Sequence, residues 1–293
     1  MPDQQDVVFN TVDGLKLAGR VYPAAQFGPA VILTPGFACV KEMFIPDVAE
    51  AFQAANITAL IYDPRNTGAS EGLPRQEIIP QKQIQDYSDA LTYLSRHPLV
   101  DPTRIAFWGF SFSGMVSLNA AALDKRAKFV IAVCPLTDFS FGGKKSKVLA
   151  KAMKDRESQV QGNAPFCLPV LTEAGENPAG FGVGTASEDF GLILNAEKTA
   201  PNYRNSTTLQ TYYHIAAWQP YGLIPQVSPT AVLMLTPEND QISLAKNQEA
   251  IFDSIQGAKK QRHVESNKGH MDILSGDSFP TLMKIQVDFL TRA

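Results

Sequence analysis

The sequence has 293 residues, 44% of them hydrophobic and 19% charged, with a formal net charge of −3 at pH 7. A chain of this kind can bury one large core, lacks any run of the roughly 20 apolar residues that cross a bilayer, and has no general attraction to nucleic acid. Its polar start predicts no secretory signal, and its three scattered cysteines predict neither disulfides nor a metal knuckle. We therefore expect a cytoplasmic protein with no cofactor or metal, acting on a small apolar partner.

The first part of the chain alternates strand-like and helix-like segments. Residues 7–11 and 15–22 read as two strands, and Asp13-Gly14 between them indicates a hairpin. The next expected elements are a buried strand at 30–34, a helix at 46–55, a strand at 57–62, a helix at 81–96, a strand at 105–108, a helix from 115 onward and a strand at 128–134. Such alternation is typical of a parallel sheet with helical crossovers.

The pattern changes after residue 135. Residues 136–227 contain helical segments and irregular Gly-Pro-Asn stretches without a convincing buried strand. Alternation then resumes with a strand at 231–235, a helix at 244–255, a strand at 262–265 and a helix at 279–290. We expect an α/β fold whose mostly parallel central sheet has helices on both faces. Its core comprises 1–135 and 228–293, and 136–227 form an inserted cap.

The strand at 105–108 leads into the segment Gly109-Phe110-Ser111-Phe112-Ser113. A tight turn between a strand and a helix requires small neighbours and exposes a serine hydroxyl at the carboxyl edge of the sheet. Gly109 fills the first small position and Ser113 the second, a departure from Gly-x-Ser-x-Gly that Gly114 can partly relieve. Ser111 is therefore the predicted nucleophile, and the alternative is an ordinary serine in a loop.

A serine nucleophile needs a base and an acid that orients it. Of the four histidines, only His270 is expected in a loop after the last strand. Asp240, in the loop after the strand at 231–235, is preferred over Glu238 as the acid. The order Ser111, Asp240, His270 is that of the α/β-hydrolase arrangement. The alternatives are a surface histidine and a plain helix cap.

Two further groups of residues complete the predicted site. The backbone amides of Phe37 and Phe112 are placed to hold the negative oxygen formed during acyl transfer. The aromatic residues of the expected cap predict an apolar pocket, with Phe139, Tyr213 and Trp218 as substrate-binding residues.

With these residues in place, the chain resembles the α/β-hydrolase superfamily over nearly its whole length. Segments 34–37, 62–68, 105–113 and 268–272 resemble the fungal polyketide transferase and thiohydrolase family, and more distantly the dienelactone hydrolases. The resemblance implies a serine enzyme that accepts an acyl chain from a polyketide synthase carrier and passes it to water or an alcohol.

Two other functions stay open. The same fold can catalyse cyclisation, C–C cleavage or isomerisation of a polyketide intermediate without an acyl-enzyme, or it can bind a ligand without chemistry. The segment from Lys144 to Arg156 is strongly basic. It is interpreted either as a solvated helix face or as a docking surface for an acidic acyl carrier domain.

Overall fold

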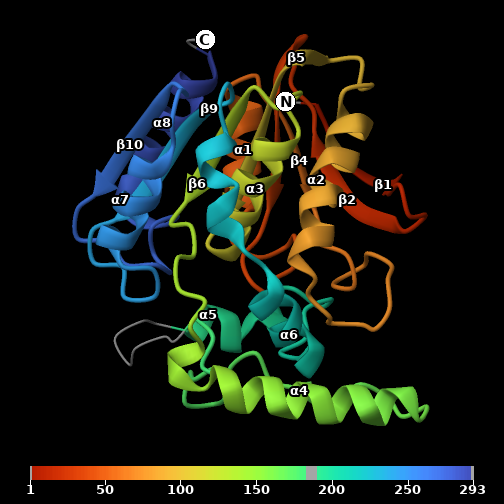
Figure 1. Cartoon of the computed structure of the whole chain (residues 1–293). Coiled ribbons are helices and arrows are strands. Elements are labelled where there is room, and N and C mark those ends of the chain that lie inside the picture. The colour runs from red at the N-terminus through yellow and green to blue at the C-terminus, as the bar shows by residue number, and fades with distance from the viewer. Residues whose placement is uncertain (1, 183–189, 292–293) are drawn as a thin grey trace.

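The structure is a computed structural model that describes residues 2–182 and 190–291. One eight-stranded sheet runs in the order β1-β2-β4-β3-β5-β6-β9-β10 (Figure 1). Its strands are β1 (Gln5–Asn10), β2 (Lys16–Tyr22), β3 (Gly28–Thr34), β4 (Thr58–Tyr62), β5 (Val100–Phe110), β6 (Phe129–Val133), β9 (Ala231–Pro237) and β10 (Lys260–Glu265). The pairs β1–β2 and β2–β4 are antiparallel and all other neighbours are parallel. The mostly parallel sheet predicted from the sequence is confirmed.

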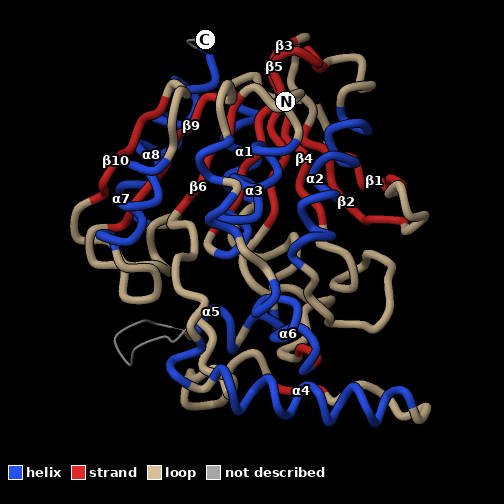
Figure 2. Tube along the Cα trace, in the orientation of Figure 1, coloured by secondary structure: helices blue, strands red, loops and turns tan. Residues whose placement is uncertain are grey.

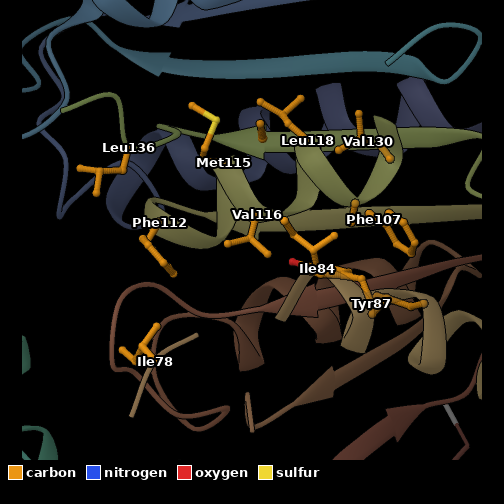
Figure 3. Close-up of a cluster of buried hydrophobic side chains, with 14 of the residues drawn as sticks. Ile78, Ile84, Tyr87, Phe107, Phe112, Met115, Val116, Leu118, Val130 and Leu136 are labelled. Carbon is orange, nitrogen blue, oxygen red and sulfur yellow. The ribbon is translucent and has the colours of Figure 1, made fainter. Parts of the chain in front are cut away.

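Helices cover both faces of this sheet. They are α1 (Pro46–Ala54) and α8 (Phe279–Thr291) on one face, and α2 (Pro80–Leu94), α3 (Phe112–Leu123) and α7 (Ala245–Ser254) on the other. Val116 of α3, Ile84 of α2 and Phe107 of β5 lie together in the cluster on the second face (Figure 3). Ala106 and Trp108, the neighbours of Phe107, belong to the cluster on the first face. A strand covered on both faces needs this continuous apolar run.

The segment between β6 and β9, residues 136–227, is called the cap segment below. Its elements are η1 (Phe141–Gly143), α4 (Lys145–Val160), β7 (Cys167–Leu168), α5 (Gly191–Leu194), η2 (Ala196–Lys198), β8 (Thr207–Thr208), α6 (Leu209–Ala217), η3 (Pro220–Gly222) and η4 (Ile224–Gln226). In its described residues, the only strands are β7 and β8, which pair with each other and not with the main sheet. Loops and short helices form most of it, and α4 lies farthest from the sheet (Figures 1 and 2).

Hydrogen bonds connect the cap segment to the core near the start of α6. Thr207 Oγ1 donates to the carbonyl of Gln76 at 2.8 Å, and the amide of Ile78 donates to Thr211 Oγ1 at 2.9 Å. The carboxylate of Glu77 lies 3.2 Å from His214 Nε2 on α6. These contacts fix α6 beyond the carboxyl ends of the parallel strands.

A short 3-10 turn, η5 (Gly276–Ser278), precedes α8. Among the helices of the described chain, none has both the length and the apolar content that a membrane span requires.

Candidate active site

Ser111 lies in the turn that joins β5 to α3. Its backbone has φ 57° and ψ −118°, a strained conformation for a residue with a side chain. Three hydrogen bonds hold this backbone: its amide donates to Val133, and its carbonyl accepts from Gly114 and Leu136, each at 2.9 Å. The end of β6 and the residues after it therefore fix the turn from outside.

The residues two positions before and two positions after Ser111 are small for different reasons. A Cβ added at Gly109 would lie 2.0 Å from the carbonyl oxygen of Ser113, so only glycine fits there. At the second position the Ser113 hydroxyl is buried and donates to the carbonyl of Pro35, in the loop after β3. Ser113 therefore stands where the Gly-x-Ser-x-Gly pattern has glycine, and its hydrogen bond connects this turn to the loop after β3.

The structure brings together Ser111, His270 and Asp240 from three loops. Ser111 Oγ lies 2.7 Å from His270 Nε2, and His270 Nδ1 lies 2.9 Å from Asp240 Oδ2. Ser111 is 9% exposed, and the other two residues are 2% exposed. An ionised carboxylate can only accept, so Nδ1 carries the imidazole proton. Nε2 is then the acceptor for the Ser111 hydroxyl.

Asp240 is held by three more donors. Its Oδ1 accepts from the amides of Ile242 at 2.9 Å and Ser243 at 2.7 Å, and its Oδ2 accepts from Gln248 Nε2 at 2.9 Å. Hydrogen bonds to a carboxylate stabilise its charged form and fix its orientation. Sequence reasoning missed Gln248, because a glutamine in the interior of α7 belongs to no motif.

Cys134 is a second residue that sequence reasoning missed. It follows β6 with a positive φ of 36°, and its Sγ lies 4.0 Å from His270 Nε2. Cys134, Asp240 and His270 have potential metal-ligand atoms within 4.8 Å of one another. Asp240 and His270 direct these atoms at each other and at Ser111, a geometry suited to moving a proton between side chains.

Phe37 lies in the loop after β3, and Phe112 directly follows Ser111. Phe112 is the first residue of α3, so its amide has no acceptor within the helix. In the ranges that the structure describes, neither amide donates to a main-chain carbonyl elsewhere. The two rings lie 5.5 Å apart, which brings the loop after β3 against the start of α3. Both amides are therefore free to hold a negatively charged oxygen.

A cavity of about 70 Å³ adjoins Ser111 and His270, between the core and the cap segment. Its apolar side chains are Phe37, Phe44, Phe110, Leu136, Val170, Leu171, Phe181, Phe190, Ile193, Ile242 and Met271. Cys39 also lines it, and burial raises the pKa of this thiol to about 12, so it stays neutral. The cavity therefore suits an apolar group bound beside Ser111.

Asn177 also lines this cavity, but its amide is engaged with protein groups. Its Nδ2 donates at 2.9 Å to the carbonyl of Val170 and to the hydroxyl of Tyr212. Its Oδ1 accepts from the amides of Ala179 and Phe181. Asn177 therefore shapes the cavity wall.

Phe139, Tyr213 and Trp218, the predicted substrate-binding residues, are not among the described residues that line this cavity, and their role stays a prediction. Trp218 lies behind the wall, with its ring 5.6 Å from that of Phe112 and 5.4 Å from that of Phe139. Tyr213 packs against Arg156 of α4, whose guanidinium carbon lies 5.9 Å from its ring centre. These contacts hold the cap segment together and pack it against the start of α3.

The basic segment from Lys144 to Arg156 coincides largely with α4. Its six basic residues are all exposed: Lys144, Lys145, Lys147, Lys151, Lys154 and Arg156. Asp155 is buried instead and accepts from the Phe166 amide and from Gln210 Nε2, both at 2.8 Å. The outer face of α4 is therefore mainly positive, although it also exposes the carboxylate of Glu157.

Comparisons with known proteins place these observations in a family context. Residues 29–166 match the family described as alpha/beta hydrolase fold. A thiohydrolase from Eupenicillium brefeldianum is 53% identical over 98% of this chain and 94% of its own length. Polyketide transferase ATR5 from Stachybotrys chlorohalonatus is 44% identical over 99% and 97%, respectively. The solved structure of DcsB in complex with its substrate analogue has a TM-score of 0.93 at 40% identity and covers 99% of both chains.

Proposed function

Because the chain belongs to the α/β-hydrolase family that includes fungal thiohydrolases and polyketide transferases, we propose that it cleaves or transfers a polyketide acyl group. The observation that carries this proposal is the hydrogen-bonded series Ser111, His270, Asp240 beside an apolar cavity. The acyl group is linked through an ester or thioester, and the acceptor is water or an alcohol.

The reaction proceeds through an acyl-Ser111 intermediate. His270 Nε2 takes the proton of the Ser111 hydroxyl while Oγ attacks the acyl carbonyl, and the amides of Phe37 and Phe112 hold the resulting oxyanion. The intermediate collapses, the bond to the thiol or alcohol breaks, and His270 returns the proton to that leaving group. Water or an alcohol then attacks the acyl carbon and transfers its proton to His270, the bond between the acyl carbon and Ser111 Oγ breaks, and His270 returns the proton to Ser111. Asp240 keeps the imidazole oriented throughout.

The cavity lining supports an apolar acyl chain as the transferred group. Its walls are mostly aromatic and aliphatic side chains from both the core and the cap segment. Burial of each methylene in such a lining contributes about 0.8 kcal/mol. Medium-length and branched acyl groups are therefore better substrates than acetyl.

Kinetics on a thioester series test this proposal. Ser111→Ala and His270→Ala each lower turnover by a factor of about 10³ or more, because nucleophile and base act as one unit. Wild-type kcat/KM rises from acetyl to medium and branched acyl groups. Near wild-type turnover by Ser111→Ala, with loss in His270→Ala, would instead favour cyclisation, C–C cleavage or isomerisation without an acyl-enzyme.

A partner proposal accompanies the chemistry. The exposed positive face of α4 provides a surface for an acidic acyl carrier domain that delivers the acyl chain. This surface belongs to the cap segment, which also supplies one wall of the cavity. A carrier docked there would present its tethered acyl group to the same part of the molecule.

A further inference from the structure

Two stretches of chain connect the cap segment to the core: residues 135–137 leave β6, and η3 and η4 lead back to β9. The hydroxyl of Tyr221 in η3 donates to the carbonyl of Thr137 at 2.5 Å. On α3, Asn119 Nδ2 donates to the carbonyl of Pro220 at 3.2 Å. The outgoing and returning stretches are therefore hydrogen-bonded to each other and to α3.

Ser243, which is fully buried, contacts both the outgoing stretch and Asp240. Its Oγ donates to the carbonyl of Pro135 at 2.6 Å and lies 2.9 Å from Thr137 Oγ1. Because the single hydroxyl proton of Ser243 is used on Pro135, Thr137 is the donor in the second pair. The amide of Ser243 donates to Asp240 Oδ1 at 2.7 Å. One residue therefore joins the start of the cap segment to the Asp240 carboxylate.

The outgoing stretch also contacts the nucleophile turn. The Leu136 amide donates to the carbonyl of Ser111 at 2.9 Å, and the Leu136 side chain lines the cavity. The Ser243 amide can reach Asp240 whatever side chain this residue carries, so the Ser243 hydroxyl adds only the link to residues 135–137. Replacing two bonded hydroxyls by apolar groups of the same shape can be nearly neutral for stability. Packing alone therefore gives no reason for a hydroxyl pair at this place.

We propose that Ser243 is a positioning residue: through Thr137 and Tyr221 it couples the seating of the cap segment to the orientation of Asp240. This role rests on the proposed function, in which Asp240 orients His270. A cap segment that shifts on the core moves the outgoing stretch, and Ser243 carries that movement to the carboxylate. A displacement of about 1 Å in such a site can lower the rate by a factor of about 10². Chemistry is therefore fastest when the cap segment is seated over the cavity.

A double-mutant cycle on kcat for an N-acetylcysteamine thioester tests this coupling. Tyr221→Phe removes only a hydroxyl from a side chain that is 46% exposed, and Ser243→Ala removes Oγ but keeps the amide bond to Asp240. Each variant lowers kcat by about five- to tenfold, as expected for one lost hydrogen bond, and changes KM by less than about twofold. The double variant lies within about twofold of Ser243→Ala, because both changes act through one chain of contacts.

The proton on His270 Nδ1 provides a second readout that needs no substrate. Its NMR signal reports the hydrogen bond to Asp240, and its exchange with solvent measures how well that bond is held. Exchange is about five- to tenfold faster in both Tyr221→Phe and Ser243→Ala than in the wild type. Thr137→Val removes the same link from its other side and replaces Ser243→Ala in the cycle if that variant does not fold.

Ser70→Ala is the matched control for Ser243→Ala. Ser70 is buried, and its Oγ donates to the carbonyl of Asp63 at 2.7 Å and accepts from the Ala18 amide at 2.9 Å. This variant loses the same kinds of hydrogen bond but keeps the wild-type kcat and the wild-type exchange rate.

Losses of kcat that multiply in the double variant, or wild-type exchange at His270 in both single variants, would overturn the coupling and leave the acyl-transfer function intact. A wild-type protein that neither turns over the thioester nor becomes acylated would overturn the proposed function instead. The exchange of the His270 proton would then still decide whether Ser243 positions Asp240.

Discussion

Four hydrogen bonds converge on the Asp240 carboxylate, from His270 Nδ1, the amides of Ile242 and Ser243, and Gln248 Nε2. Each carboxylate oxygen accepts from two of these donors, so both oxygens must remain acceptors. The residue therefore has a structural reason for its fixed position and, in the proposed mechanism, a chemical reason for its charge: it favours the imidazole tautomer that accepts the Ser111 proton.

Asp240→Asn tests this role. The amide can donate to His270 and so favours the wrong tautomer, and we expect kcat to fall by a factor of about 10² to 10⁴ without loss of fold. Steady-state kinetics and circular dichroism measure the two effects. Glu238→Gln is the control, because Glu238 is a nearby carboxylate whose Oε2 accepts from the Asn267 amide at 3.1 Å. A larger loss in Glu238→Gln than in Asp240→Asn would reverse the assignment.

Sequence reasoning could bring Ser111, Asp240 and His270 together because each follows a strand whose carboxyl end lies at the same edge of a parallel sheet. It could not identify Gln248 or Cys134. Their positions beside the site arise from how α7 and the end of β6 pack, and neither residue type at those positions signals a role.

At the scale of elements, the junction of β5 and α3 determines where the Ser111 hydroxyl points. We expect Gly109→Ala to shift the turn, because its Cβ has no space beside the Ser113 carbonyl. The loss of stability is about 2 kcal/mol or more, and turnover falls with it. Ser113→Gly keeps the space and loses the hydrogen bond to Pro35, so it costs about 1 kcal/mol and retains turnover.

Urea unfolding and kcat of both variants provide the measurement. The ordering of the two variants is the decisive result. Full activity and stability in Gly109→Ala, together with an inactive Ser113→Gly, would contradict the explanation of the two small positions.

The core elements and the cap segment differ in how far sequence predicts them. Continuous apolar runs such as that of β3 predict buried strands well, because every position must be apolar when both faces are covered. In the cap segment, short helices and loops have no repeating pattern that tells which aromatic side chain faces the cavity. Phe181 and Trp218 are both buried aromatics there, yet only Phe181 lines the cavity.

At the scale of the whole molecule, the positive face of α4 contrasts with a net charge of −3. If this face steers an acidic carrier domain, charge reversal at Lys144, Lys147 and Lys151 slows turnover of carrier-bound acyl groups. It leaves N-acetylcysteamine thioesters unaffected, because these reach the cavity without docking. Steering acts on association and weakens as salt screens it, so the difference shrinks with rising ionic strength.

The matched control reverses three exposed lysines of the core, at Lys246, Lys259 and Lys284. The change in net charge is the same, so a specific docking surface predicts no comparable loss. Equal losses of turnover in the two triple variants, or equal effects of the α4 variant on both substrates, would contradict docking at α4. The basic segment would then be only a solvated helix face.

The central claim is that Ser111 becomes acylated, and intact-mass spectrometry tests it most directly. The protein is mixed with a medium-chain N-acetylcysteamine thioester, quenched at short times and compared with Ser111→Ala; a fluorophosphonate probe is run in parallel. We predict a mass increase equal to one acyl group in the wild type, located on Ser111 by peptide mapping, and none in the variant. Turnover of the thioester without any adduct on Ser111, or an equal adduct in Ser111→Ala, would contradict the account.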